Sequence, residues 1–445
     1  MDGYPKKSSP SSDPGVRRSW RTFLTHFFYP GLGVKRWLLI GAIGISMVSI
    51  GLAFVMKYMF ALPTPDVLPW YWEGVLLGMA GVVVLLLGIY GLYRSIGPVL
   101  FPAPSLNSLT DAIYTRRFRG RGPHIVVIGG GTGLSVLIRG LKEHTDNLTA
   151  IGTVADDGGS SGRLRRDMGV LPPGDFRNCL VAMSDAENLV QELFQYRFDQ
   201  GDGLEGHSFG NLFLVAMTNV TGSFEKALYE SSRVLAVHGQ ILPASVNNVS
   251  LTAHMIDGSV VQGESSITQI GGRIGQVFIE PEAVEAYPPS VDAIRDAQLI
   301  VIGPGSLYTS ILPNLLVNGI SEAIKKSHAK KIYVCNMATQ KGETDGYTMS
   351  DHVDALHKHT FPTIVDFVVA NHVKVKLGSQ FLGEGVELDN SLKKYVRVVS
   401  DDLMDVNHPV RHDANKLGQV IMDIYNRKRG VKPGNKLVGF RGNRG

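Results

Sequence analysis

The feature that most constrains how this chain folds is an apolar strand that passes through a glycine turn directly into a helix. Residues 124–128 read HIVVI, residues 129–133 read GGGTG, and apolar residues then recur at helical spacing along 134–141. Glycine lets a backbone approach a phosphate closely, and a helix start offers unpaired N–H groups. The spacing departs from G-x-G-x-x-G, so a tight turn without a ligand stays the alternative. The candidate contacts are Gly130, Gly131, Thr132 and Gly133.

The same arrangement returns near residue 300. The strand 298–302 (QLIVI) runs into GPGS and a helix that begins near Leu307. Two strand–glycine–helix units predict a doubly wound, mainly parallel α/β sheet and favour a nucleotide or another phosphorylated ligand, because each helix start can hold a phosphate. The candidates in this second turn are Gly303, Gly305 and Ser306.

Two adjacent acids follow the second predicted strand, 148–154. In a doubly wound sheet the end of this strand stands beside the first glycine turn, where an acid reaches a ribose hydroxyl or a bound cation. Asp156 and Asp157 precede GGSSG, whereas one aspartate would suffice for a plain surface turn. We therefore expect both to bind a ligand hydroxyl or Mg²⁺, with a solvated, capped turn as the alternative.

Polar residues also stand at the starts of two helices that are apolar nearly all round, in LPPGDFRNCLVAMS and EGHSFGNLFLVAMT. Side chains at the mouth of a buried helix supply the hydrogen bonds of a pocket. Helix capping explains an aspartate there, but it does not require Arg177 or His207. The histidine suits acid–base chemistry, although the sequence names no partner for it, and no catalytic residue is assigned. The ligand candidates are Asp175, Arg177, Asn178, His207 and Asn211.

Three further segments complete the expected sheet. Residues 249–267 alternate around an Asp-Gly pair, a strong hairpin signal, and predict an antiparallel insertion. The strands 331–336 and 363–371 both end in asparagine, at the edge where α/β sheets place ligands. The candidates after the first of these strands are Asn336, Thr339 and Gln340. The sequence contains no zinc-binding His/Cys spacing, no G-x-S-x-G elbow and no Walker lysine.

Two uncharged apolar stretches of 20 residues, 37–56 and 74–93, precede this domain. About 20 residues at ~1.5 Å each cross a hydrocarbon core of ~30 Å, so the stretches predict a two-helix transmembrane hairpin. A buried core helix or a signal peptide explains them less well, because the second stretch returns the chain and no small-residue cleavage site follows Met56. Basic residues gather before the first stretch and after the second, so both ends are expected in the cytoplasm.

The predicted organisation is a basic cytoplasmic tail at 1–36, a two-span hairpin at 37–93, a linker at 94–122 and a cytoplasmic ligand-binding domain at 123–445. The chain is thus expected to be a multi-pass cell membrane protein. Its net charge of +4 hides an imbalance, since residues 1–121 hold 13 of the 44 Lys/Arg but only 5 of the 40 Asp/Glu. We assign this basic excess to membrane topology and expect no nucleic acid partner. Two cytoplasmic cysteines, Cys179 and Cys335, are expected to be free thiols.

Six motifs occur in this order: VIGGGTGLS, VADDGGSSG, LPPGDFRNCL, GHSFGNL, IVIGPGSLYTSILPNLL and NMATQKGETDGY. Together they resemble the gluconeogenesis factor (YvcK-like) family, within the CofD-like superfamily of 2-phospho-L-lactate transferases, over about residues 123–430. The resemblance implies a Rossmann-like core with an inserted substructure, a homodimer, and binding of a UDP-sugar, either UDP-N-acetylglucosamine or UDP-glucose. It also implies a role in cell shape and envelope (peptidoglycan) synthesis during gluconeogenic growth, with cell-wall synthesis proteins as partners.

The resemblance assigns three segments to the nucleotide pocket, namely Gly130–Gly133, Asp156–Asp157 and Gly303–Ser306. In the transferase branch this pocket holds a guanine nucleotide-linked phospholactate, and a deazaflavin acceptor and Mg²⁺ lie near the acidic turn. GPGSL stands here where that branch has a GPSNP-like loop, which weighs against transferase activity. We expect a ligand-binding protein, with a Mg²⁺-dependent transferase that uses a nucleotide-diphosphate donor as the alternative.

Overall fold

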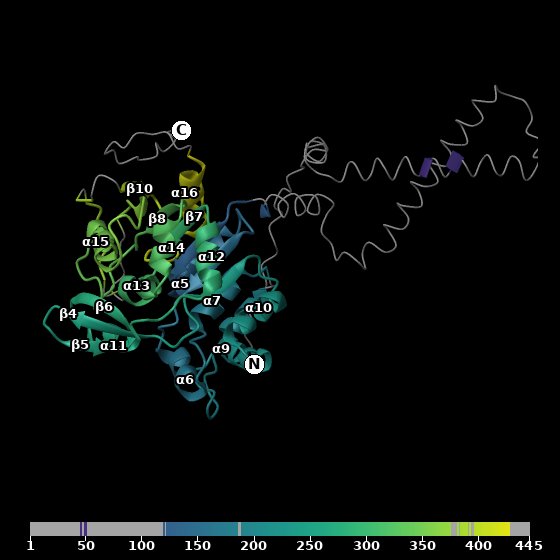
Figure 1. Ribbon diagram of the computed structural model, residues 1–445, viewed down its shortest axis with the longest axis horizontal. Coiled ribbons are helices and arrows are strands. Elements are labelled where there is room, and N and C mark those ends of the chain that lie inside the picture. Colours follow the sequence, from purple (N-terminus) through teal and green to yellow (C-terminus); the bar gives the residue numbers. More distant parts are fainter. Residues whose placement is uncertain are drawn as a thin grey trace, which may run out of the picture. The chain divides into compact units, whose positions relative to one another are not determined.

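The chain divides into two compact units, 1–116 and 117–445. The computed structural model describes residues 45–46, 49–50, 119–120, 122–185, 188–374, 381, 383–389, 391–392 and 396–427. The predicted basic tail and almost all of the predicted membrane hairpin lie outside these residues. Among the described residues, no helix has the length and apolarity needed to cross a membrane. All described strands belong to the second unit (Figure 1).

A seven-stranded parallel sheet forms the centre of the second unit, in the order β10-β9-β8-β7-β1-β2-β3. Its strands are β1 (Ile125–Gly129), β2 (Leu148–Gly152), β3 (Gln240–Pro243), β7 (Leu299–Ile302), β8 (Lys330–Val334), β9 (Phe367–Asn371) and β10 (Arg397–Asp401). The chain moves outward from β1 to β3 and then returns to β7 on the other side of β1, so the strand order reverses between β1 and β7. Open α/β sheets bind their ligands at such a switch point.

Helices cover the sheet in two groups, as right-handed crossovers require. On one side α5 (Gly131–Leu141) packs against both α7 (Gly174–Met183) and α16 (Ala414–Asn426). The crossing of α5 and α16 is close, because a Cβ atom on Gly140 would lie 2.1 Å from the Ala414 carbonyl oxygen. The second group contains α12 (Pro288–Asp296), α13 (Leu312–Leu316), α14 (Ile320–Lys326) and α15 (Met349–His359).

Four more helices connect β2 to β3, namely α6 (Gly159–Met168), α8 (Asn188–Gln195), α9 (Phe209–Thr221) and α10 (Phe224–Val234). The apolar residues predicted for one face of α5, from Leu134 to Leu141, are fully buried, as are the apolar residues of β1. A strand buried on both faces reads as one continuous apolar run, which explains why the sequence pattern identified β1 so clearly.

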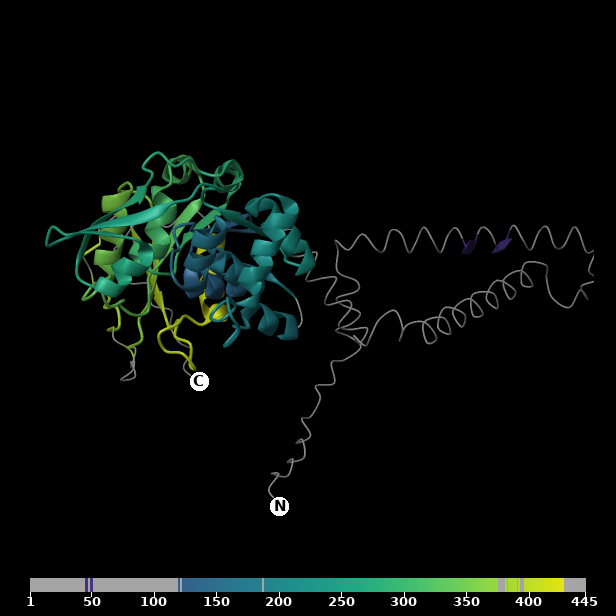
Figure 2. The same ribbon diagram turned by 90° about the horizontal axis from the view of Figure 1, so that it is seen from below.

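A small antiparallel sheet is inserted between β3 and β7, in the order β5-β4-β6. It contains β4 (Ser250–Met255), β5 (Val260–Gln262) and β6 (Ile274–Glu280), with α11 (Glu264–Ile270) between the last two. The predicted hairpin is confirmed, and its tip projects from the second unit in both views (Figures 1 and 2). The strand pattern ends earlier than predicted, because Gly263 has a φ of +97° and turns the chain into α11.

The prediction of a Rossmann-like, mainly parallel α/β sheet is therefore confirmed for the second unit. The sequence did not reveal β3 or β10, the two edge strands. It also missed that the second glycine turn leads first into a five-residue π-helix, η1 (Leu307–Ile311), and only then into α13. The first glycine turn leads directly into eleven residues of regular α-helix. The two strand–glycine–helix motifs therefore differ in how their helices begin.

Candidate functional site

The two glycine turns touch each other at the carboxyl edge of β1 and β7. A Cβ atom on Gly133 would lie 2.6 Å from the Pro304 carbonyl oxygen, and one on Gly305 would lie 3.1 Å from the Gly130 carbonyl oxygen. Only glycine allows backbones this close, so the turns need it for packing as well as for ligand approach. Gly130, the N-cap residue of α5, has no side chain to cap the helix, and the first N–H groups of α5 face this edge.

The second turn uses its own N–H groups within the protein. The Gly303 N–H donates to the Ile128 carbonyl oxygen at 2.8 Å, and the Gly305 N–H donates to Asn336 Oδ1 at 3.2 Å. The Asn336 amide returns a hydrogen bond to the Gly305 carbonyl oxygen at 2.8 Å. The second turn therefore packs against the first turn and stabilises it. Because two of its N–H groups already donate within the protein, it has fewer of them available for a phosphate than the first turn has.

The other predicted residues after β8 also hold loops together. Ser306 Oγ donates to Gln340 Oε1 at 2.6 Å, which ties the second turn to the loop that follows β8. Thr339 exchanges hydrogen bonds with the backbone of Glu384, at 2.7 and 2.9 Å. The structure thus brings Ser306, Asn336 and Gln340 together, as the strand ends predicted, while their polar atoms already have protein partners.

Asp175 lies under the first glycine turn. Its Oδ1 accepts the Gly131 N–H at 2.8 Å, and its Oδ2 lies 2.3 Å from where a Cβ atom on Gly130 would be. Burial, followed by the charge of Asp156, raises the pKa of Asp175 to about 7. Asp175 therefore places an acid with a strongly raised pKa at the start of α5.

The adjacent aspartates Asp156 and Asp157 face two different helix starts. Asp156 Oδ1 accepts the Gly158 N–H at 2.9 Å, directly before α6, and Asp157 Oδ1 accepts the Ser265 N–H at 2.8 Å, in the first turn of α11. Among the residues that the structure describes, no three His, Cys, Asp or Glu side chains are arranged to hold a metal ion. The pair therefore offers Mg²⁺ at most a partial set of carboxylate ligands.

Two glutamates that the sequence did not single out as site residues join these aspartates. Burial, followed by the charges of Asp156 and Asp175, raises the pKa of Glu264 well above its ordinary range. Glu343 Oε1 accepts hydrogen bonds from Gln340 Nε2 at 2.7 Å and from two threonine hydroxyls, and burial raises its pKa to about 7. We call the group of five acids the carboxyl cluster: Asp156, Asp157, Asp175, Glu264 and Glu343.

Comparison with known proteins places the chain in a family. The model of the family described as 2-phospho-L-lactate transferase CofD matches residues 125–424. The "Gluconeogenesis factor" of Bacillus subtilis is 50% identical over 313 residues, which cover 68% of this chain and 99% of the relative. A Nostoc sp. protein named "Putative gluconeogenesis factor" is 46% identical over 417 residues, covering 89% of this chain and 91% of the relative. This chain belongs to the gluconeogenesis factor family, within the CofD-like superfamily.

A crystal structure from this family has the same fold. It is a UPF0052 family member from Bacillus halodurans, 47% identical, with a TM-score of 0.63 over 68% of this chain and 99% of its own. The Nostoc alignment is longer than the second unit, 117–445, and so it also takes in part of the first unit. Gluconeogenesis factors thus occur with and without a preceding segment of this kind.

The remaining predicted residues of this gluconeogenesis factor form a buried network behind the glycine turns. His207 Nδ1 and Ser160 Oγ share a hydrogen bond of 2.9 Å, and Asn211 Nδ2 donates to the same hydroxyl at 3.0 Å. Arg177 donates to Ser208 Oγ at 2.5 Å and to Asn178 Oδ1 at 2.9 Å. Burial, followed by the charge of Arg163, lowers the pKa of His207, so the imidazole is neutral at pH 7. The network connects α6, α7 and α9.

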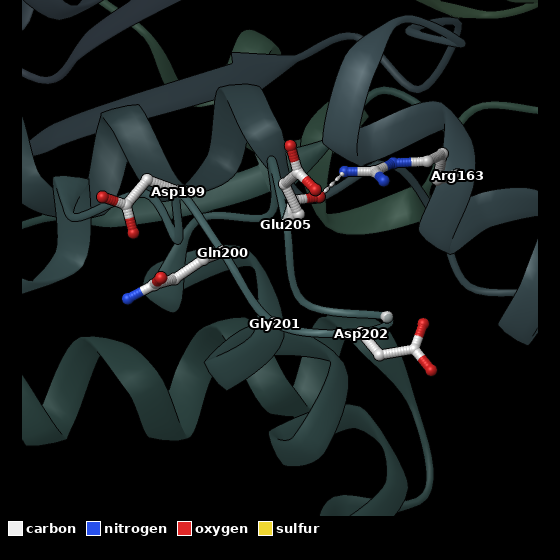
Figure 3. A pocket seen from close by; sticks show the side chains of 7 residues that line it. Arg163, Asp199, Gln200, Gly201, Asp202 and Glu205 are labelled. Atoms are coloured by element: carbon white, nitrogen blue, oxygen red, sulfur yellow. Dashed lines mark hydrogen bonds between the residues drawn. The ribbon is translucent and has the colours of Figure 1, made fainter.

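A hollow of about 370 Å³ lies beside α6, between Arg163 and the turn 199–205 (Figure 3). Arg163 Nη2 crosses to the Glu205 carbonyl oxygen at 2.7 Å, and the side chains of Asp199 and Asp202 point away from each other. A second hollow of about 280 Å³ lies at the tip of the inserted sheet. Neither hollow is lined by a predicted ligand residue, so the candidate site stays at the switch point of the main sheet.

Proposed function

We propose that this gluconeogenesis factor binds a UDP-sugar, UDP-N-acetylglucosamine or UDP-glucose, at the carboxyl edge between β1 and β7. The observation that carries the proposal is the start of α5 at the switch point, where the N-cap residue is a glycine, Asp175 accepts the Gly131 N–H, and a second glycine turn lies beside the helix start. Helix N–H groups and the helix dipole stabilise a diphosphate without a basic patch. The acids of the carboxyl cluster are suited to the hydroxyl groups on either side of the diphosphate.

We propose a regulatory role for the bound state. The relatives carry the name gluconeogenesis factor, and a sugar nucleotide is a precursor of the cell envelope. The ligand-bound protein would then adjust cell shape and peptidoglycan synthesis during gluconeogenic growth, as a homodimer that contacts cell-wall synthesis proteins. The charge distribution favours these partners over nucleic acid, because the second unit has no net basic excess.

We also propose that the first unit anchors the protein in the cell membrane. The support is the pair of 20-residue uncharged stretches, 37–56 and 74–93, with basic residues on their outer sides. Both termini and the second unit would lie in the cytoplasm. Reporter fusions at either end and in the connecting segment 57–73 test this topology, because only the connecting segment should be exported.

A second candidate function, Mg²⁺-dependent transfer from a nucleotide-diphosphate donor, is favoured by the acidic turn beside the glycine turns. Mg²⁺ would bind through Asp156 or Asp157 together with phosphate oxygens of the donor, since Mg²⁺ commonly takes one or two carboxylates plus substrate phosphates. It would neutralise charge on the diphosphate. Donor consumption that Asp157→Asn abolishes would support this candidate, and turnover unaffected by EDTA would exclude it.

Isothermal titration of the purified full chain with UDP-N-acetylglucosamine tests the main proposal. We expect saturable binding, and we expect Gly130→Ala to weaken it at least tenfold, about 1.4 kcal/mol, because the new methyl group displaces Asp175 from the turn. Gly203→Ala in the exposed turn 199–205 is the control for backbone strain alone, because Gly203 has a φ of +73° and a Cβ atom there meets no described neighbour within 4 Å. No saturation below millimolar ligand, or equal effects of the two substitutions, would contradict the proposal.

A further inference from the structure

The carboxyl cluster gathers acids from four separate segments around two helix starts. Asp156 Oδ1 and Glu264 Oε2 lie 3.5 and 3.9 Å from one point, the position of a Cβ atom on Gly158. Asp156 Oδ2 is 3.2 Å from the corresponding position on Gly174, directly before Asp175. Asp157 and Glu343 hold α11 against the same edge through Ser265 and Thr268. The cluster therefore adjoins the glycine turn where the diphosphate is proposed to bind.

In the part of the chain that the structure describes, no arginine or lysine forms a direct ion pair with this cluster, although the charges of Arg165 and Arg177 act on its aspartates. None of the five carboxyl groups forms an ion pair with another described residue. The neighbouring Arg165 donates instead to the carbonyl oxygens of Val249 and Val154, at 2.7 and 3.5 Å. Mutual repulsion contributes to the raised pKa values of Asp175 and Glu264. An additional negative charge at this place would be repelled.

One acceptor in the cluster has no hydrogen-bond partner among the described residues. Glu343 is 2% exposed, and its Oε2 is buried without a hydrogen bond, while Oε1 accepts three. Thr268, one turn after Glu264 in α11, donates to Glu343 Oε1 at 3.3 Å, so this carboxylate lies beside the cluster. A buried acceptor left without a donor is costly, and a ligand hydroxyl would supply that donor.

We propose that the carboxyl cluster receives the hexose of the bound nucleotide sugar, accepts hydrogen bonds from its hydroxyl groups and rejects hexoses that carry a carboxylate. The inference rests on the proposed binding of a UDP-sugar. A ribose offers two hydroxyl groups, whereas a hexose offers more, and five carboxyl groups exceed what a ribose can use. Hydrogen bonds from hydroxyls to carboxylates are among the stronger ones in proteins, so they increase the affinity for a neutral sugar. Charge repulsion lowers the affinity for a sugar that carries a carboxylate.

UDP-glucose and UDP-glucuronate provide the test, because they differ only at C6, which carries a hydroxymethyl group in one and a carboxylate in the other. We expect the full chain to bind UDP-glucuronate about 100-fold more weakly than UDP-glucose in isothermal titration. Asp156→Asn should narrow that ratio to about tenfold, because Asp156 supplies the negative charge that also raises the pKa values of Asp175 and Glu264. The control Glu282→Gln, at an exposed position after β6, should leave the ratio unchanged.

The outcomes separate this inference from the proposed function. If neither sugar nucleotide binds, the proposed function fails and the inference fails with it. If both bind with equal affinity, the proposed function stands and the hexose assignment is overturned. A ratio that persists unchanged in the Asp156→Asn protein would also overturn the assignment, because the rejection would then come from other residues.

Discussion

Replacing Asp175 by asparagine should make the second unit more stable at neutral pH. Burial raises the pKa of Asp175 from 3.8 to about 7. Between these pH values the folded protein keeps a proton that the unfolded chain has released, so the free energy of unfolding falls as the pH rises. At ~1.36 kcal/mol per pH unit the penalty reaches about 4 kcal/mol above pH 7. Asparagine never ionises, and its Oδ1 can still accept the Gly131 N–H.

The stability gain should therefore depend on pH. We expect the variant to exceed the wild type by about 1.5 kcal/mol at pH 5 and by about 4 kcal/mol at pH 8. Urea titrations read by pulsed hydrogen exchange of β1 peptides measure it, because all four tryptophans lie in the first unit and their fluorescence would not report on the sheet. Asp199→Asn, in an exposed turn, is the control and should change nothing. Equal gains at pH 5 and pH 8 would refute the reasoning.

Three further predictions use the same titration. Burial lowers the pKa of His412 to about 4, and the unfolded chain takes up a proton first, near pH 6.5. Between pH 6.5 and pH 4 the free energy of unfolding of the wild type should thus fall by about 3 kcal/mol relative to that of His412→Gln. A difference between the two proteins that does not change with pH would contradict this. Gly133→Ala places a methyl group 2.6 Å from the Pro304 carbonyl oxygen and should cost about 1–3 kcal/mol. Thr348→Ala removes the N-cap of α15 and should cost about 1 kcal/mol; an unchanged midpoint in either variant would disprove its assigned role.

Local patterns in the sequence were sufficient to predict the central strands. Continuous β-branched segments such as 125–128 and 299–302 are buried on both faces, so their composition alone identifies them. The edge strands β3 and β10 escaped prediction because each pairs on one side only in the described sheet and their composition is less apolar. The helix α11 escaped because Gly263, at positive φ, interrupts an alternating pattern that otherwise continues.

From the sequence, only those residues of the candidate site that directly follow predicted strands could be placed. Parallel strands place their carboxyl ends at one edge, so the glycine turns and Asp156–Asp157 had to lie near each other. Glu264 carries no such signal, because it reaches the edge through an inserted segment whose direction depends on tertiary packing. The bond from Ser265 to Asp157 joins residues 108 positions apart. His207 and Arg177 were recognised as unusual, and their partner Ser160 was found only in the structure.

The sequence by itself determined the sheet's core strands, the glycine turns and the family, since these depend on composition and spacing along short segments. The tertiary structure decided which glycine turn leads directly into a regular α-helix, and it brought five acids from distant segments into one cluster. The physical reason is that burial and charge act through space. A pKa or a missing hydrogen-bond partner is set by neighbours that the fold supplies, whereas strand and turn preferences are set by neighbours along the chain.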